Sequence, residues 1–415
     1  MRHSVRLLLL VTLLTSSVLF AVPAGAAGLP LPVPGPCQDG VLPSGALSRI
    51  CIPTANWNGD LVVYAHGYTA FNAPLDLQHL ELPNGAYLPD LVQNLGFAFA
   101  ATNYRRNGLV IPDGAADIRE LVAAFPGVAG RAPDHTYITG VSEGGIIAAL
   151  LVEQSPELFS GGLSLCGPVG SFKQQVDYWG DFRLLFDYFF PAALPPGPFN
   201  IPQALIDGWE GFYKPVVEAR VAADPAAARQ LIRTSKAAVA LTNPTTTVQT
   251  IDNLLWYNIY ATNDAIAQFG GNPFDNTNHV YLGSRNDWQL NRDIPRYPPN
   301  PGALGALGPY ETSGRVTIPL VTLHTTSDEI VPFWHQLLYR AKLRAAGSTA
   351  VIQIPIPRYG HCNFTTAEVL GGFGLLVLEV TGKHPEDIQQ LFTPDQAQRD
   401  FGQAERDAER AESER

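Results

Sequence analysis

The sequence is poor in charged residues. Only 16% of its 415 residues are Asp, Glu, Lys or Arg, whereas 46% are hydrophobic, so the chain can bury a substantial core and is not globally disordered. Acidic residues outnumber basic ones and give a formal charge of −11, which argues against nucleic acid or an anionic membrane surface as the main partner. These figures exclude classes of partner but indicate no fold.

Long apolar runs are lacking beyond the N-terminus. A basic start (residues 1–6) precedes an apolar run (7–22), and Pro23 ends that run before small residues up to Ala26. The run is short for a membrane span and is typical of a secretory signal. We therefore expect residues 1–26 to be a signal peptide cleaved near Ala26, and the mature protein to be secreted without a stable membrane span. An uncleaved anchor is the alternative.

Cysteine is scarce as well. The four cysteines form no C-x-x-C pair, and the chain has no H-E-x-x-H, so neither a metal nor a cofactor is predicted. An even number of cysteines in an exported chain favours two disulfides. Of the three possible pairings, Cys37 with Cys51 is the local choice, which leaves Cys166 with Cys362.

The chain does contain a G-x-S-x-G motif, formed by Gly140, Ser142 and Gly144. Residues 135–139 before it are β-branched and aromatic and predict a short buried strand, while 145–153 after it predict an apolar helix. A sharp turn between strand and helix exposes a serine hydroxyl at the carboxyl end of the strand. Ser142 is therefore the predicted nucleophile; the alternative is a tight Gly/Ser turn without chemistry.

Strands alternate with helical patterns on both sides of this motif. That alternation predicts an α/β fold with a mostly parallel sheet and helices on both faces. The predicted strands are 48–53, 60–65, 97–102, 135–139, 162–166, 316–323 and 350–355, and the predicted helices are 117–124, 145–153, 333–346 and 367–380.

The alternation stops between two late strands. Residues 169–314 are helical and aromatic at first and rich in Asn, Asp, Pro and Gly from 271 to 312, where we expect long structured loops. Because this insertion leaves the sheet at its carboxyl edge, we predict a largely helical cap rather than an independent binding domain. The catalytic domain then comprises 27–168 and 315–383, and a charged tail without chemistry occupies 384–415.

A serine nucleophile needs a neighbouring base that is itself oriented by an acid. Asp328 follows strand 316–323 in a polar turn, and His361 lies in a loop after strand 350–355. We predict that Asp328 orients His361, and that His361 takes the proton of Ser142. The base must be neutral for this step, so activity is expected to rise through the ordinary pKa range of histidine.

From residue 60 to 380 the chain resembles secreted α/β-hydrolases of the esterase and lipase kind. The resemblance lies in the motif order Ser142, Asp328, His361 and in the His-Gly-Tyr segment that ends at Tyr68. It implies the α/β-hydrolase fold, with an oxyanion hole formed by the backbone N–H groups of Tyr68 and Glu143.

The residue after the catalytic histidine, Cys362, is similar to that of tannases and feruloyl esterases. Those enzymes link this cysteine to one just before the serine, but here Val141 stands before Ser142. Cys166, which ends the strand next to the motif, is the substitute partner.

Each assignment has a competing interpretation. Glu329 is a rival acid, and two histidines, His324 and His335, are rival bases outside the expected last loop. We expect His66 to have a structural role rather than to act as a base. The side chain of Glu143 is expected to face solvent and to transfer no proton. Asn272, Asp275, Asn276 and Asp287 lack the spacing of a calcium loop and are read as turn formers.

The sequence as a whole predicts a secreted serine hydrolase of the carboxylesterase or lipase type. Its expected substrates are small-molecule or polymeric carboxylic esters with a hydrophobic or aromatic part, since the aromatic run 176–190 supplies rings for the cap core and for the roof of an acyl pocket. A serine peptidase related to prolyl aminopeptidases is the first alternative. A non-catalytic binding protein on the same scaffold is the second.

Overall fold

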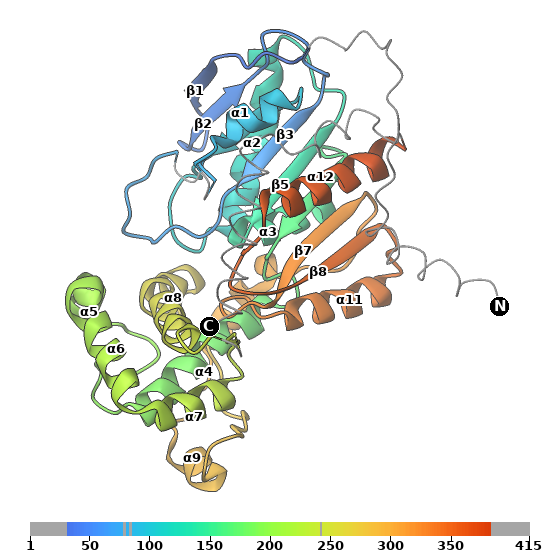
Figure 1. Cartoon of the computed structure of the whole chain (residues 1–415). Helices are drawn as coiled ribbons and strands as arrows, with labels where there is room; N and C mark the ends of the chain where they lie inside the picture. Colours follow the sequence, from blue (N-terminus) through green and yellow to red (C-terminus); the bar gives the residue numbers. More distant parts are fainter. Residues whose placement is uncertain (1–30, 78–79, 83–84, 241–242, 383–415) are drawn as a thin grey trace, which may run out of the picture. The chain divides into compact units, whose positions relative to one another are not determined.

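The computed structural model describes residues 31–77, 80–82, 85–240 and 243–382. The predicted signal peptide and the charged tail lie outside these residues. A single eight-stranded sheet organises the described chain (Figure 1). Its strands are β1 (Cys37–Val41), β2 (Leu47–Cys51), β3 (Leu61–Ala65), β4 (Ala98–Thr102), β5 (Thr136–Val141), β6 (Gly161–Leu165), β7 (Leu320–Ser327) and β8 (Val351–Tyr359).

The strand order is β1-β2-β4-β3-β5-β6-β7-β8. The second strand runs antiparallel to both of its neighbours, and all pairs from β4 to β8 are parallel. Every residue of the central strands β4 and β6 is buried, as expected for parallel strands covered on both faces. This arrangement is the α/β-hydrolase fold, which confirms the predicted fold class.

Two hydrophobic cores lie on opposite faces of the sheet because successive side chains of each strand point to opposite sides. The larger core contains Val63 and Ile138 and is covered by α2 (Ile111–Ala129), α3 (Glu143–Gln154) and α11 (Trp334–Ala346). The smaller core is covered by α1 (Leu88–Asn94) and α12 (Thr366–Thr381). Among the described residues, no helix is both long and apolar enough to span a membrane.

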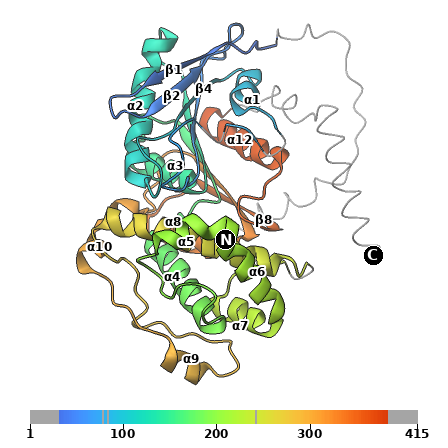
Figure 2. The ribbon, with the colours of Figure 1, turned by 90° about the vertical axis from the view of Figure 1, so that its left-hand side faces the viewer.

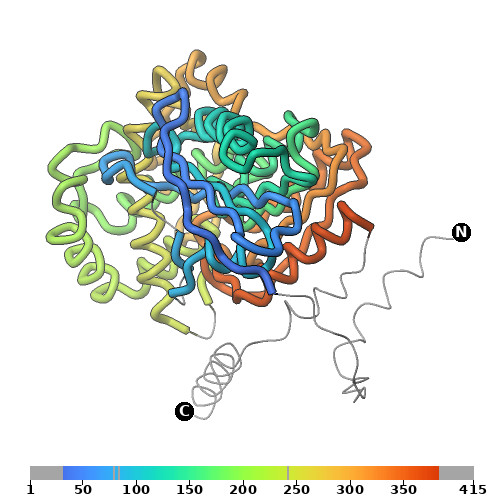
Figure 3. Tube along the Cα trace, turned by 90° about the horizontal axis from the view of Figure 1, so that it is seen from above, coloured from blue at the N-terminus to red at the C-terminus, as the bar shows by residue number. Residues whose placement is uncertain are grey.

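A helical insertion connects β6 to β7 and belongs to the same compact unit as the sheet (Figure 2). In the tube view of Figure 3, its lime-green part lies on the opposite side from the red helix α12. The division into catalytic and cap domains stays a prediction. The insertion comprises α4 (Phe172–Phe189), α5 (Gln203–Gly208), a π-turn (Trp209–Tyr213), α6 (Lys214–Ala223), α7 (Pro225–Ser235), α8 (Thr246–Phe269), α9 (Asp287–Asp293), α10 (Pro301–Ala306) and a 3-10 turn (Gly308–Tyr310).

Several elements differ from the sequence expectation. The segment before the first predicted strand, which starts at residue 48, contains β1, and the region 271–312, expected to be long structured loops, contains α9 and α10. Strand β7 begins at Leu320 rather than at residue 316, because Pro319 cannot donate a ladder hydrogen bond and its carbonyl instead accepts one from Gly162.

The first predicted disulfide, Cys37–Cys51, is present in the structure. The two cysteines are opposite each other in the antiparallel β1–β2 pair, with a Cα–Cα distance of 4.1 Å. This bond therefore fixes an edge hairpin and lies apart from the candidate site.

Candidate active site

Ser142 occupies a sharp turn between β5 and α3. Its backbone has φ 57° and ψ −118°, an unfavourable conformation that places the residue between strand and helix. Steric crowding explains why glycines flank the serine. A Cβ atom at Gly140 would lie 1.9 Å from the carbonyl oxygen of Gly144, and a Cβ atom at Gly144 would lie 2.0 Å from the carbonyl oxygen of Ala65. The G-x-S-x-G pattern is thus a packing requirement of this turn.

Asp328 directly follows β7 and is buried. Its Oδ1 accepts hydrogen bonds from the backbone N–H groups of Ile330 (3.0 Å) and Val331 (2.8 Å). These bonds hold one carboxyl oxygen in place and leave the other, Oδ2, directed at a side chain from a distant loop.

That side chain is His361, which lies in the turn after β8. Its Nδ1 is 2.8 Å from Asp328 Oδ2, and its Nε2 is 2.8 Å from Ser142 Oγ. The three residues come from the ends of three parallel strands, whose carboxyl ends meet at one edge of the sheet. The structure brings the three predicted residues together in hydrogen-bond contact.

The electrostatics of His361 favour its protonated form. Burial opposes a charge on the ring, but the charge of Asp328 and its hydrogen bond outweigh that effect, so the pKa of His361 lies above its ordinary value of 6.5. The imidazolium that forms when a histidine takes the serine proton is therefore stabilised in place.

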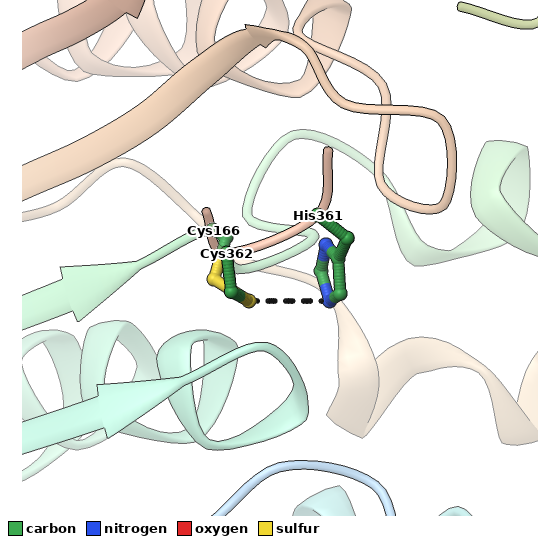
Figure 4. A group of neighbouring side chains, drawn as sticks. All are labelled: Cys166, His361 and Cys362. Carbon is green, nitrogen blue, oxygen red and sulfur yellow. Dashed lines mark hydrogen bonds between the residues drawn. A yellow bond between two sulfur atoms is a disulfide. The ribbon is translucent and has the colours of Figure 1, made fainter. Parts of the chain in front are cut away.

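The second predicted disulfide, Cys166–Cys362, is also present and lies beside His361 (Figure 4). Cys166 follows β6, and its backbone N–H donates to Leu323 of β7, so the bond anchors the histidine loop to the middle of the sheet. Cys362 Sγ lies 3.3 Å from His361 Nε2.

The same three side chains are close enough to hold a metal ion, since their ligand atoms lie within 4.8 Å of one another. However, the two sulfur atoms are bonded to each other and are not thiolates, which are the form that binds metals. With the disulfide intact, the arrangement of Cys166, His361 and Cys362 suits positioning rather than metal binding.

The rival side chains have other partners. Glu329 is buried, and its Oε1 accepts a hydrogen bond from Asn253 of α8. His324 Nε2 lies 2.7 Å from the carbonyl oxygen of Val331, and it is farther, 3.5 Å, from Asp328 Oδ2. Burial holds the pKa of His324 and that of His335 below the ordinary value of 6.5.

His335 of α11 is held in place by hydrogen bonds to residues at the start of the insertion. Its Nδ1 accepts hydrogen bonds from the backbone N–H groups of Gly170 and Ser171, and its Nε2 lies 2.7 Å from Gln175 Oε1. It therefore fastens α11 to the start of α4.

The loop after β3 passes beside the serine. A Cβ at Gly67 would lie 3.3 Å from Ser142 Cβ, so only glycine allows this approach without displacement. His66 Nδ1 lies 2.7 Å from the carbonyl oxygen of Gly67, and its ring stacks on Tyr104, in keeping with a structural role. The oxyanion hole at Tyr68 and Glu143 stays a prediction; Glu143 begins α3, and the first N–H groups of a helix have no intrahelical partner.

A small cavity of about 20 Å³ adjoins Ser142. Its roof is aromatic and comes from the insertion: Phe172 and Trp179 of α4 and Tyr257 of α8. Trp179 and Tyr257 stack with a centroid distance of 5.4 Å. The aromatic run 176–190 includes Trp179, whereas Phe172 and Tyr257 lie outside that run and were missed.

The side chain of Glu143 corrects the sequence expectation, because it does not face solvent. It is 5% exposed, lines the cavity, and its Oε1 accepts a hydrogen bond of 2.8 Å from the backbone N–H of Val110. Burial raises the pKa of Glu143 to about 8. Sequence reasoning missed this environment because Val110 and the insertion are distant in the chain.

Hydrogen bonds fasten the insertion over the site. Tyr178 donates to the carbonyl of Glu329, and Tyr68 donates to the carbonyl of Tyr260 in α8. Asp264 of α8 accepts from a backbone N–H in the loop before α2. The roof of the cavity is therefore tied to the same loops that carry Asp328 and Tyr68.

Three of the four residues considered as calcium ligands make local turn contacts. Asn272 Oδ1 accepts from Phe274 N, and Asp275 Oδ1 accepts from Thr277. Asp287 Oδ1 accepts from Ser284 N. These contacts agree with the interpretation of Asn272, Asp275 and Asp287 as turn formers. Asn276 differs: it is buried, and its Oδ1 accepts from Tyr297 N, so it joins two segments that are distant in the sequence.

Comparisons with known proteins place this site in context. No protein-family model matches the chain. A stretch of 136 residues, 32% of the chain, is 31% identical to a protein named "Putative esterase NocK" from Nocardia uniformis subsp. tsuyamanensis. The match covers 36% of that relative's length, about a third of it.

Solved structures with low sequence identity also match. Candida antarctica lipase A in its closed state is 15% identical, with a TM-score of 0.45 and coverage of 84% of this chain and 78% of the lipase. The Pyrococcus furiosus esterase Pf2001 is 11% identical, with a TM-score of 0.43 and coverage of 84% and 98%. The acylaminoacyl peptidase of Pyrococcus horikoshii is 15% identical, with a TM-score of 0.40 and coverage of 80% and 38%. The α/β-hydrolase fold itself is defined by the strand order.

Proposed function

We propose that this protein is a secreted serine hydrolase that cleaves carboxylic esters with a hydrophobic or aromatic part. The observation that carries the proposal is the double contact of His361, whose two ring nitrogens each lie 2.8 Å from an oxygen, one of Ser142 and one of Asp328. A serine, a base and an orienting acid in this geometry are the requirements for nucleophilic acyl transfer.

The reaction proceeds in two halves. Ser142 Oγ attacks the ester carbonyl while His361 Nε2 takes its proton, and the backbone N–H groups of Tyr68 and Glu143 stabilise the oxyanion. His361 then protonates the leaving alkoxide, which departs as the alcohol. In the second half, a water molecule attacks the acyl-enzyme, again through His361, and releases the carboxylic acid and free Ser142.

The walls of the cavity support an ester rather than a peptide substrate. A peptidase that holds a free amino terminus requires acidic groups in the roof, whereas the roof here consists of Phe172, Trp179 and Tyr257. A volume of about 20 Å³ holds roughly one water molecule. Binding of an ester therefore requires that the cavity widen beside Ser142.

Export is supported by the two disulfides, which persist in oxidising compartments. It also rests on the signal-like sequence of residues 1–26. Cleavage near Ala26 can be checked by N-terminal sequencing of the protein recovered from a culture medium.

The decisive assay compares p-nitrophenyl esters with peptide p-nitroanilides, using Ser142→Ala as the control. We expect turnover of the esters that disappears in the variant. Turnover of anilides with a free amino terminus, without ester turnover, would favour the peptidase. A fluorophosphonate that fails to label the wild type would favour a non-catalytic binding protein.

A further inference from the structure

The cavity beside Ser142 contains two polar groups without partners. Among the described residues, Glu143 Oε2 and Trp179 Nε1 are fully buried and have no hydrogen-bond partner. Both residues line the same cavity, and only 5% of Glu143 and 8% of Trp179 are exposed. An unpaired buried polar atom costs about 1–3 kcal/mol, so a bound group that paired with either atom would gain stabilisation beside Ser142.

Both groups belong to residues that line the cavity, and both can donate a hydrogen bond. An indole N–H can only donate. Glu143 Oε1 already accepts from Val110 N–H, so a proton on the neutral carboxyl resides on Oε2. Since burial raises the pKa of Glu143 to about 8, the neutral form prevails at and below neutral pH.

We propose that Glu143 and Trp179 form a polar subsite that selects esters whose acyl chain carries an acceptor oxygen, as an ether or a ketone does. This inference rests on the proposed esterase function and deepens it. The rest of the cavity is largely apolar, so once it has widened to admit an ester, an oxygen within a short aliphatic chain suits it better than a charged group does.

The cavity belongs to the acyl side of the site rather than to the alcohol side. His361 must reach the leaving alcohol to protonate it, and His361 does not line the cavity. Tyr68 and Glu143, whose backbone N–H groups face the carbonyl oxygen in the proposed mechanism, do line it. The acyl chain therefore extends from the carbonyl toward Trp179.

The charges around Glu143 come from other elements. Asp264 of α8 raises its pKa, and Arg106 from the loop before α2 lowers it, both less than burial does. Burial raises the pKa of four tyrosines near Glu143, and the negative charge of Glu143 raises the pKa of each of them further. They therefore stay neutral up to high pH; they are Tyr68, Tyr104, Tyr257 and Tyr310. Ionisation of Glu143 is therefore the change expected inside this cavity between pH 6 and 9.

The test compares two esters of equal chain length, p-nitrophenyl 3-methoxypropanoate and p-nitrophenyl pentanoate. The measured quantity is the ratio of their kcat/KM values, because titration of His361 affects both esters alike and cancels. Trp179→Phe keeps a ring against Tyr257 but removes the N–H. Trp209→Phe removes a buried indole elsewhere in the insertion and is the matched control.

We expect the wild type to favour the methoxy ester at pH 6, and Trp179→Phe to lower the ratio roughly three- to tenfold, the effect of one hydrogen bond. Trp209→Phe should leave the ratio unchanged. The wild-type ratio should fall by a similar factor toward pH 9, as Glu143 loses the proton that it donates. Glu143→Gln keeps an acceptor for Val110 and offers an N–H instead, so its ratio should be independent of pH.

An unchanged ratio in Trp179→Phe, or a wild-type ratio that stays flat from pH 6 to 9, overturns the proposal. The second measurement needs no variant and does not depend on whether Trp179→Phe folds. Failure of the wild type to hydrolyse either ester would instead refute the proposed function, so the two failures are distinguishable.

Discussion

Replacement of Glu143 by glutamine should change how the stability of the protein depends on pH. The buried carboxyl has its pKa raised from 4.5 to about 8, whereas the unfolded chain has the ordinary value. The folded protein therefore holds a proton that the unfolded chain releases between these values, and this group's contribution to stability is lost as pH rises through that window. Glutamine is neutral throughout and retains an acceptor for Val110 N–H.

The magnitude follows from proton linkage. With values of 4.5 and about 8, raising the pH from 5 to 8 weakens the wild type relative to Glu143→Gln by about 3.5 kcal/mol. Urea unfolding at pH 5, 6, 7 and 8, with both disulfides intact, measures this difference. Glu157→Gln removes the same charge from an exposed position just after α3 and is the control.

The result that would refute the reasoning is a stability difference between wild type and Glu143→Gln that does not change with pH. Such a result would mean that Glu143 is ionised in the folded protein as readily as in the unfolded chain. In that case Glu143 Oε2 would have a hydrogen-bond partner in solution, or the cavity would be open to solvent, and the carboxyl would not be buried and unpaired as described above.

Three further predictions concern the triad and its loop. Ser142→Ala and His361→Ala should each reduce ester turnover by at least about 10⁴-fold, and the double variant should turn over esters only slightly more slowly than either single variant. Asp328→Asn should reduce turnover by a smaller factor, and near-wild-type turnover in this variant would exclude Asp328 as the orienting acid. The kcat/KM should rise with pH through a value above 6.5, because Asp328 outweighs burial and raises the pKa of His361; a flat profile from pH 5 to 8 would exclude this base. Replacing Cys166 and Cys362 by serine should cost up to about 5 kcal/mol, given the sequence separation of 196, and mild reduction should lower activity before the fold is lost; unreduced peptide mapping and unfolding curves test both points.

The elements that local chemistry determines could be predicted from the sequence. The apolar runs of β3, β4 and β5 and the glycines around Ser142 indicated the fold, because buried parallel strands and a tight strand-to-helix turn leave strong local patterns. The order of the late motifs then led to Asp328 and His361, which the structure places in contact with the serine.

Features that depend on distant contacts and leave no sequence motif could not be predicted. The solvent-facing side chain expected of Glu143 is in fact buried, because Val110 and the insertion enclose it. Tyr257 lies in a helix that the sequence indicated, but nothing local shows that its ring would stack on Trp179 over the site. Short helices such as α9 depend on caps within an Asn- and Asp-rich segment that resembles a loop in composition.

The central claim is that Ser142 attacks an ester carbonyl and carries the acyl group. Intact-mass spectrometry of the disulfide-intact protein, quenched in acid during turnover of a p-nitrophenyl ester, tests it directly, with peptide mapping of the adduct. The account predicts one acyl group on Ser142, released on further incubation and missing in Ser142→Ala. Continued ester turnover in Ser142→Ala, or an acyl group on another residue, would contradict it.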